Sequence, residues 1–347
     1  MLTLLIANVM FLPLQTQTVR ASEKSSIEMY FPNDIEGHWA YDELDNFVVA
    51  DLLNGYEEAN GEVTIRPEKT ITRSEFVALL VRALGLQSSE QNSKTFTDVP
   101  ADKWYYEPIR IASSLGIVNG VSDKSFGPNK PINRGDIATM IVRAFDDTVE
   151  FGGGTSHPFE DVPSYYATQS IIDAYGADII KGLKPNKFMP FSNAKRAEAV
   201  VMLQRALDIQ KSDLPNEEAL KSLISAADET EIHAINTGEV FNLGKLYNEH
   251  FTAYQLMSNQ EYAGTLQEIV QESYSIELYE ATARTLDVVF ASDRFAVVKS
   301  TGGSYRFTYW NSDDTNTITE SNDGFYCMKK MEDNKWKIYA IYQEDEQ

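Results

Sequence analysis

Three arginines with regular spacing are the residues best suited to bind an anion. Arg73, Arg134 and Arg196 follow one another at intervals of 61 and 62 residues, and each begins a stretch with helical hydrophobic periodicity. A cation in the first turn of a helix opposes the helix dipole, so its recurrence needs a reason. Backbone N–H groups at a helix start and a guanidinium together make a compact site for a carboxylate. The spacing therefore predicts anion sites, with a plain surface arginine as the alternative.

The residues beside each arginine differ between the three copies. Thr72 and Glu75 flank Arg73 in the pattern of a capping box, which explains both residues without any ligand. The second copy has an asparagine at the cap position and a glycine that weakens the helix. The third copy has a lysine at the cap position and so replaces the cap by a second positive charge. The further candidates in these two copies are Asp136, Lys195 and Glu198.

The arginines belong to three repeats, at residues 30–86, 95–147 and 158–208. Each repeat has a helical stretch that a glycine is expected to end, a polar loop with a proline, and a second amphipathic helix. One such helix pair cannot bury its own apolar face, so the three units should pack on each other. The pattern predicts an all-α bundle with approximate threefold symmetry. The residues that keep the period are Asp34, Asp98 and Asp161; Gly55, Gly120 and Gly182; and Pro67, Pro128 and Pro190.

The repeat pattern also resembles a known family. An Asp-Val opening, a nearby Trp, an internal Gly-Ile-Val-Xaa-Gly turn and an Ile-Thr-Arg-Ala-Glu-like helix start are similar to those of S-layer homology domains, over roughly residues 30–208. The resemblance implies a pseudo-threefold bundle whose grooves bind secondary cell-wall polysaccharide, often bearing pyruvylated amino sugars. It also implies that the basic residue at the helix start holds the polymer.

Aromatic residues recur near the opening of each repeat. They are Trp39, Trp104 and the pair Tyr165-Tyr166. Aromatic faces can pack on the C–H surfaces of a sugar, while their polar edges form hydrogen bonds. Packing between helices explains the same residues equally well. The third repeat lacks a Trp, so we expect its groove to bind most weakly.

Two further sets recur with the repeat period, and each has a structural explanation. The three aspartates of the repeat openings could cap the first helix or bind a sugar hydroxyl. Three later arginines are interpreted as structural, because a cation near the end of a helix suits the dipole. These later arginines are Arg82, Arg143 and Arg205.

The region at residues 215–343 has a different pattern. Helical stretches at 219–238 and 260–274 come first. Turn signals then separate strand-like runs rich in Tyr, Thr, Val, Ile and Phe. This order predicts an α+β domain of helices followed by an antiparallel sheet, and it weakly resembles the NTF2-like fold. The strand-like runs are 275–285, 286–293, 294–302, 304–311, 324–332 and 335–343.

No catalytic motif is found in this C-terminal region. His233 and His250 have no nucleophile or metal-ligand spacing beside them, and no phosphate loop occurs. We therefore expect no enzyme activity, no metal and no cofactor. A wall-anchored enzyme with catalysis in the concave face of the sheet is the alternative. A pocket with a paired carboxylate and a histidine or tyrosine would favour that alternative, and an apolar fill would favour a binding module.

Composition excludes several classes of protein. The chain has 347 residues and a net charge of −22, which argues against a general nucleic-acid binder. Binding to an anionic polymer must therefore use local basic residues. The one cysteine, Cys327, excludes an intramolecular disulfide and thiolate metal clusters.

The first 21 residues are similar to an export signal. An apolar run from Leu2 to Leu14 precedes Val19-Arg20-Ala21, which predicts cleavage after Ala21. No Lys or Arg precedes the apolar run, so the true start could lie upstream. A buried N-terminal strand or helix is the alternative. No other segment approaches the length of a membrane span.

These observations predict a secreted bacterial protein held non-covalently at the cell wall, with the C-terminal domain displayed. The expected partner is a cell-wall polysaccharide, for which the resemblance implies pyruvylated sugars. Neither nucleic acid as a partner nor a membrane span in the mature chain is expected. Surface-layer or other proteins could bind the C-terminal domain, and repeats that serve only protein assembly are a third hypothesis. The candidate polysaccharide-binding residues are Asp34, Trp39, Thr72, Arg73, Glu75, Asp98, Trp104, Arg134, Asp136, Asp161, Tyr165, Lys195, Arg196 and Glu198.

Overall fold

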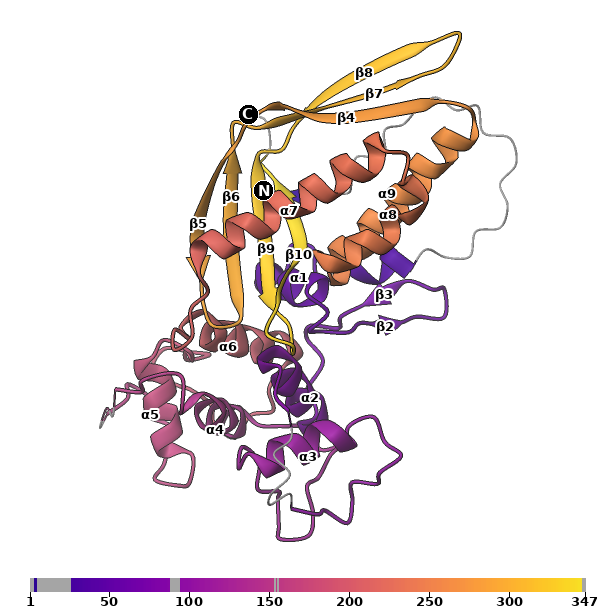
Figure 1. The fold of residues 1–347 in the computed structure, drawn as a ribbon. Helices are drawn as coiled ribbons and strands as arrows, with labels where there is room; N and C mark the ends of the chain where they lie inside the picture. Colours follow the sequence, from indigo (N-terminus) through magenta and orange to yellow (C-terminus); the bar gives the residue numbers. More distant parts are fainter. Residues whose placement is uncertain (1–2, 5–25, 88–93, 153, 155, 345–347) are drawn as a thin grey trace. The chain divides into compact units, whose positions relative to one another are not determined.

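The chain forms two compact units in a computed structural model that describes residues 3–4, 26–87, 94–152, 154 and 156–344 (Figure 1). The repeat unit comprises Pro32–Val48 and Leu52–Asp213, and the C-terminal unit consists mainly of Leu214–Gln347. The repeat boundaries expected within the first unit stay predictions. None of the helices in the described part of the chain has the length and apolarity that a membrane span requires.

Most of the expected signal peptide lies outside the described residues, including the cleavage after Ala21. Only Thr3–Leu4 of that segment are described, as strand β1, which pairs antiparallel with strand β10 of the C-terminal unit. The short 3-10 helix η1 follows at Ser26–Tyr30. Export of the chain stays a prediction.

Two helices form in each expected repeat. The second helix is buried almost all round: ten of the twelve residues of α2 are buried, which places this helix at the centre of the unit. The strands β2, Tyr56–Glu57, and β3, Val63–Thr64, form a small hairpin, so the all-α prediction is wrong at this point. The helices are α1 (Tyr41–Val49), α2 (Arg73–Leu84), α3 (Tyr106–Ser114), α4 (Arg134–Phe145), α5 (Thr168–Gly176) and α6 (Arg196–Asp208).

A closed triangle of backbone hydrogen bonds joins the three second helices just before they begin. The N–H of Ile71 donates to the carbonyl of Ala194 at 3.1 Å, Ala194 donates to Ile132 at 2.9 Å, and Ile132 donates to Ile71 at 3.0 Å. All three side chains are buried. This cyclic pairing supports the expected threefold arrangement, because each segment takes the same place relative to the next.

The repeated glycines do not end the first helices as expected. Gly120 lies six residues beyond the end of α3, and the left-handed residue that follows this helix is Gly116. Gly120 is needed for a close approach instead: a Cβ there would lie 2.7 Å from the carbonyl oxygen of Ser125. Cβ atoms added at Gly55 and Gly182 would also lie within 3.0 Å of a backbone carbonyl oxygen.

The C-terminal unit has helices first and antiparallel strands afterwards, as predicted. Its helices are α7 (Glu217–Asn236), α8 (Val240–Leu246), η2 (Tyr247–Glu249) and α9 (Ala253–Gln271). Its strands are β4 (Ser275–Thr282), β5 (Thr285–Ala291), β6 (Phe295–Thr301), β7 (Ser304–Trp310), β8 (Thr315–Ser321), β9 (Gly324–Lys330) and β10 (Trp336–Gln343). Helix α8 and strand β8 were not expected from the sequence. The likeness to the NTF2-like fold stays a prediction.

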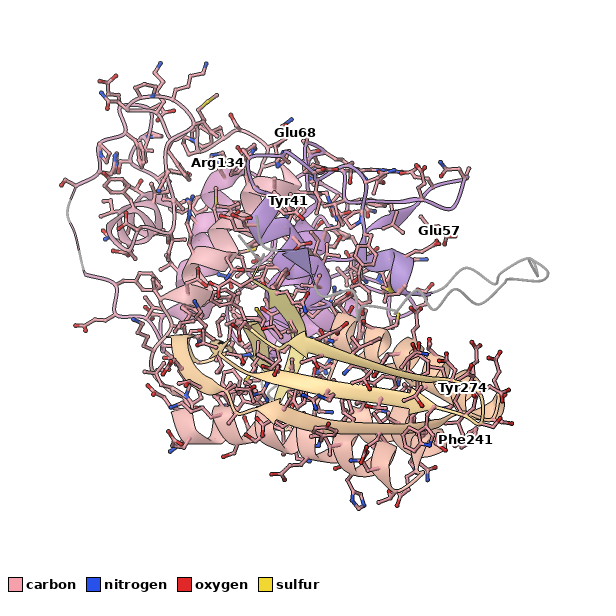
Figure 2. All side chains as sticks on the ribbon, turned by 90° about the horizontal axis from the view of Figure 1, so that it is seen from above. Tyr41, Glu57, Glu68, Arg134, Phe241 and Tyr274 are labelled. Carbon is pink, nitrogen blue, oxygen red and sulfur yellow. The ribbon has the colours of Figure 1, made fainter. Side chains whose placement is uncertain are left out.

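The strands form two sheets, ordered β1-β10-β9-β6-β5 and β4-β7-β8. Figure 2 shows the strands crossing over one face of the helices of this unit. Between these layers lies a core that includes Leu243, Phe307, Met328 and Ile338. Strands of both sheets pack against α7 and α9, and a space remains between the layers, which is described below.

Candidate functional site

The three candidate arginines enter the interior of the repeat unit. Their exposed fractions are 5% for Arg73, 2% for Arg134 and 4% for Arg196. Each Nε donates to a carbonyl of a neighbouring repeat: Arg73 to Phe126 at 3.1 Å, Arg134 to Phe188 at 2.9 Å, and Arg196 to Ile65 at 2.8 Å. They are therefore not plain surface residues.

An acidic residue of the next repeat pairs with each arginine. Arg73 lies 2.8 Å from Asp136, and Arg134 lies 3.1 Å from Glu198. The ring closes where Arg196 approaches Glu75 at 3.6 Å. Burial lowers the pKa of Arg73, while the charge of Asp136 raises it. The candidate acids thus connect the repeats in a closed circle.

The helix starts are occupied by the chain itself. The N–H of Arg73 donates to the Lys130 carbonyl at 2.9 Å, and the N–H of Ser74 donates to the Pro128 carbonyl at 3.1 Å. The starts of α4 and α6 are satisfied in the same way by Ser192 and Pro190, and by Lys69 and Pro67. The expected role of these backbone groups in binding a ligand anion is therefore wrong. The proline loop of the adjacent repeat supplies the acceptors that a helix N-terminus needs.

The capping box at Thr72 is confirmed. The N–H of Glu75 donates to Thr72 Oγ1 at 3.2 Å, and the N–H of Thr72 donates to Glu75 Oε2 at 2.8 Å. Burial raises the pKa of Glu75, but hydrogen bonds from Thr72 and Tyr56 and the charge of Arg196 bring it below its ordinary value. Lys195 has no acceptor for a cap, and its Nζ reaches the Glu68 carbonyl at 2.9 Å.

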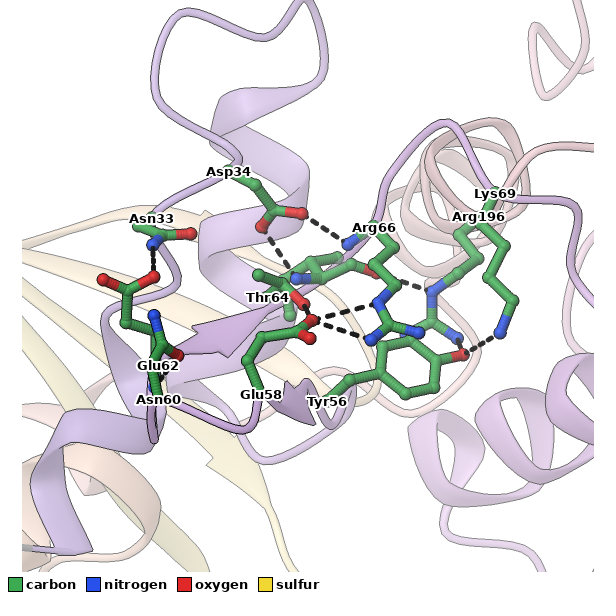
Figure 3. A network of polar contacts seen from close by, with 11 residues as sticks. Asn33, Asp34, Tyr56, Glu58, Asn60, Glu62, Thr64, Arg66, Lys69 and Arg196 are labelled. Atoms are coloured by element: carbon green, nitrogen blue, oxygen red, sulfur yellow. Dashed lines mark hydrogen bonds and ion pairs between the residues drawn. The ribbon is translucent and has the colours of Figure 1, made fainter.

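The three aspartates hold loops rather than helix starts. Asp34 accepts the N–H groups of Ile65 and Arg66, each at 2.7 Å (Figure 3). Asp98 and Asp161 accept two main-chain N–H groups each in the same way. Helices α3 and α5 have no side-chain cap, so the expected cap is wrong there. The loops these aspartates hold carry the repeated prolines.

A first groove combines side chains from all three repeats. This cavity of about 220 Å³ is lined by Arg196, Glu75, Arg82 and Trp104, together with the turn at 52–56. Arg82 is exposed and donates to the Leu52 carbonyl at 2.8 Å. Arg82 thus makes a contact within its own repeat and also lines the groove, and its purely structural role stays a prediction.

Tyr56 forms one wall of this first groove. Figure 3 shows Arg196 and Lys69 directed at its hydroxyl, at 3.1 and 3.3 Å. The Arg196 guanidinium also lies 4.8 Å from the centre of the Tyr56 ring. In the other repeats, Phe126 and Phe188 lie against Arg73 and Arg134 in this manner. Tyr56 therefore supplies a ring where the first repeat has Ile65.

A second groove is built from equivalent positions, each taken from the next repeat. This cavity of about 430 Å³ is lined by Arg73, Asp136, Arg143 and Tyr166, with the turn at 117–121. The Tyr166 hydroxyl donates to Asp136. Each groove thus contains two arginines, one acid and one exposed aromatic residue, and the first groove also contains Tyr56. Each groove takes residues from all three repeats, so the sequence repeats do not correspond to single grooves.

The aromatic residues of the repeat openings lie at the surface. Trp39, Trp104 and Tyr166 are 61%, 62% and 67% exposed, which does not support core packing. Tyr165, the tyrosine expected to bind, is half-buried, and its hydroxyl would lie 2.2 Å from a Cβ added at Gly135. The glycine in this helix start therefore makes room for Tyr165. The groove residue is Tyr166, which lies five residues after its repeat aspartate, as Trp39 does, and that spacing was the available signal.

Comparison with known proteins gives these repeats a family. A family model, described as the S-layer homology domain, matches residues 95–138 and 158–200. These two segments are S-layer homology domains. The first expected repeat, at 30–86, is not among the residues matched by the family model.

Three relatives illustrate where such domains occur. An amylopullulanase of Thermoanaerobacterium thermosulfurigenes is 30% identical over 180 residues, which is 51% of this chain and 9% of the relative. The surface-layer 125 kDa protein of Lysinibacillus sphaericus is 32% identical over 181 residues, 51% of this chain and 14% of the relative. A cellulosome-anchoring protein of Acetivibrio thermocellus is 27% identical over 164 residues, 46% of this chain and 36% of the relative.

The chain thus spans well under half the length of these relatives. Matches to relatives named as enzymes cover only the part with S-layer homology domains, so they concern attachment rather than catalysis. The S-layer homology domains give the protein a place at the bacterial cell wall or cell surface, where they act as an anchor.

Proposed function

We propose that the repeat unit anchors the chain non-covalently by binding secondary cell-wall polysaccharide in the grooves between its repeats. The observation that carries this proposal is the composition of the two grooves. Each brings an exposed aromatic ring next to a carboxylate and two arginines, and the residues come from three repeats. A ring can pack on a sugar face while charged groups bind its hydroxyls and acidic substituents.

The exposed arginines are the best candidates to meet an acidic substituent of the polymer. Arg82 and Arg143 lie at the surface, whereas Arg73 and Arg196 are buried and already paired with half-buried acids. A carboxylate on the sugar would bind the outer guanidinium, and the inner one would position the groove. By the cyclic pairing, a third groove would form around Arg134 and Glu198 with Trp39.

The test compares two tryptophan variants of the full chain. Trp104→Ala removes the exposed ring of the first groove, and Trp310→Ala removes a partly exposed ring from the C-terminal unit. Calorimetry with a soluble terminal fragment of the wall polymer should show affinity up to about tenfold weaker for Trp104→Ala, since an aromatic contact contributes ~0.5–1.5 kcal/mol. Trp310→Ala should bind as the unaltered chain does. Equal affinity of both variants would place the polymer elsewhere.

Sedimentation with purified walls separates anchoring from protein assembly. We expect the chain to sediment with walls and to remain in solution once the non-peptidoglycan polymer has been extracted. Retention on extracted walls would favour repeats that bind protein or peptidoglycan. In the proposed arrangement the C-terminal unit is the part displayed at the surface.

A further inference from the structure

The C-terminal unit contains a cavity of about 210 Å³ between its helices and its sheets. Apolar side chains form much of its wall, among them Phe251, Leu278, Phe307 and Ile318. They come from the segment before α9, from β4, from β7 and from β8. The cavity lies wholly within this unit, so its interpretation does not depend on the anchoring function.

The charged groups of this cavity are acidic. Among the described residues that line it, Asp228, Glu231 and Glu320 are acids, and none is a lysine, arginine or histidine. Asp228 is neutralised by Arg284, which also donates to the Tyr326 hydroxyl at 2.7 Å. Two carboxyl groups therefore face the cavity without a compensating cation from the described residues around it.

Glu231 is the acid placed deepest among aromatic rings. Within the described part of the chain it has no ion-pair partner, and Tyr247 and Tyr262 are its polar neighbours. An unpaired carboxylate in such surroundings is costly, because burial removes its hydration. A cation that entered the cavity would offset this cost.

Two further polar atoms are buried without hydrogen-bond partners among the described residues. They are the hydroxyl of Tyr247, whose side chain is 1% exposed, and Oε1 of Gln255, which is 4% exposed. Both residues line the cavity together with Glu231. Buried polar groups are normally hydrogen-bonded, so unsatisfied acceptors beside a cavity point to a donor that binds there.

We propose that this cavity binds a small primary amine with an apolar body. An ammonium group has three N–H donors and no acceptor, which matches a carboxylate, an amide oxygen and a hydroxyl. Its positive charge suits the acidic end, and aromatic rings attract it further. The apolar body would pack on Phe251, Phe307 and Ile318.

The charge of Glu231 makes this binding dependent on pH. Burial raises the pKa of Glu231 to about 7, although the neighbouring Tyr247 hydroxyl acts in the opposite direction. Below that pH the group is neutral, so amine binding should strengthen as pH rises from about 5.5 to about 8. Burial raises the pKa of Glu320 as well, which acts in the same direction. The other titratable groups around the cavity are Asp228 on α7, Tyr247 on η2, Tyr262 on α9, Arg284 between β4 and β5, Tyr305 on β7 and Tyr326 on β9.

Calorimetry on the full chain tests the proposal with three probes of similar shape. Benzylamine carries the cation, benzyl alcohol is its neutral counterpart, and benzoate is its anionic counterpart. At about pH 8 we expect benzylamine to bind at least about tenfold more tightly than benzyl alcohol. The difference is the charge-assisted hydrogen bond from the ammonium group to the carboxylate, which the alcohol cannot form. Benzoate should not bind. Benzyl alcohol as tight as benzylamine, or no binding of benzylamine at millimolar concentration, would overturn the proposal.

Two glutamate variants on the same helix locate the site. Glu231→Gln should weaken benzylamine binding about tenfold or more and abolish its pH dependence. Glu229→Gln, an exposed position two residues earlier on α7, is the matched control and should change neither. If Glu231→Gln proves unstable, Tyr247→Phe removes only the unpartnered hydroxyl and should also weaken binding. Unchanged binding by Glu231→Gln and Tyr247→Phe would show that the amine binds elsewhere.

Discussion

Arg134 shows what the recurrent arginine does at the scale of a single residue. Its guanidinium donates to the carbonyls of Phe188 and Lys181 and pairs with Glu198, all in the next repeat. The positive charge of Arg134 at the start of α4 is unfavourable because it opposes the helix dipole. Three acceptors from the next repeat offset this electrostatic cost. The residue joins two repeats, and the proposed third groove lies at this junction.

Removal of this arginine should therefore affect folding first. Arg134→Ala leaves the largely buried Glu198 carboxylate, 11% exposed, without its partner, and the loss of one member of a buried ion pair costs about 3–5 kcal/mol. The measurement is the free energy of unfolding in urea. Arg110→Ala is the control, because Arg110 forms an exposed pair with Glu107 on the same helix, and its loss should cost less than about 1 kcal/mol. Similar losses for both variants would show that the buried ring contributes little.

At the scale of elements, the turn at 117–121 determines how one groove is shaped. It follows α3, lines the second groove and contains Gly120. Both Gly116 and Gly120 have positive φ, at 73° and 81°. Only Gly120 has neighbours where a Cβ would be placed, since Gly116 has nothing within 4 Å. A comparison of the two glycines therefore distinguishes the cost of the left-handed backbone from the cost of a steric contact.

Alanine at each glycine should give different losses of stability. Gly116→Ala should cost about 1–2 kcal/mol, because only the left-handed conformation is penalised. Gly120→Ala should cost more, about 2–4 kcal/mol, because the Ser125 carbonyl must also move. Thermal unfolding of both variants measures the difference. Equal melting temperatures of the two variants would mean that the loop around Ser125 moves away from the added methyl group at little cost.

The second helices of the repeats and the cap at Thr72 were predictable, whereas the caps of the first helices and some other elements were not. The start of α2 followed from the capping box at Thr72 and from apolar periodicity. Strand β8 was missed because Ile318 is its one apolar residue, so it has no alternating pattern, and pairing with β7 stabilises it instead. The arginine partners were missed for a different reason. Asp136, Glu198 and Glu75 were candidates from the sequence, but each pairs with an arginine of another repeat, and that pairing follows only from the circular arrangement of the repeats.

At the scale of the whole repeat unit, the backbone triangle of Ile71, Ile132 and Ala194 predicts a single cooperative unfolding. Each amide of the triangle depends on a carbonyl of another repeat, so no repeat can open without loss of its neighbour's hydrogen bond. Hydrogen exchange of these three amides should show equal protection, at the free energy of global unfolding. Arg134→Ala should lower all three by the same amount. Faster exchange at one amide would indicate that its repeat opens separately.

The circle is completed by its last member, and this has a consequence for a growing chain. Arg196 donates to the Ile65 carbonyl through its side chain and to the Lys69 carbonyl through its backbone N–H. The loop of the first repeat therefore gains these hydrogen bonds only after α6 has been synthesised. A chain cut short before α6 leaves these carbonyls and the adjoining apolar faces open to water. Such a product is a good substrate for proteases, because they cleave chains that stay open. We therefore expect a chain cut before α6 to be degraded faster than the full chain, because only α6 supplies the donors that close the circle.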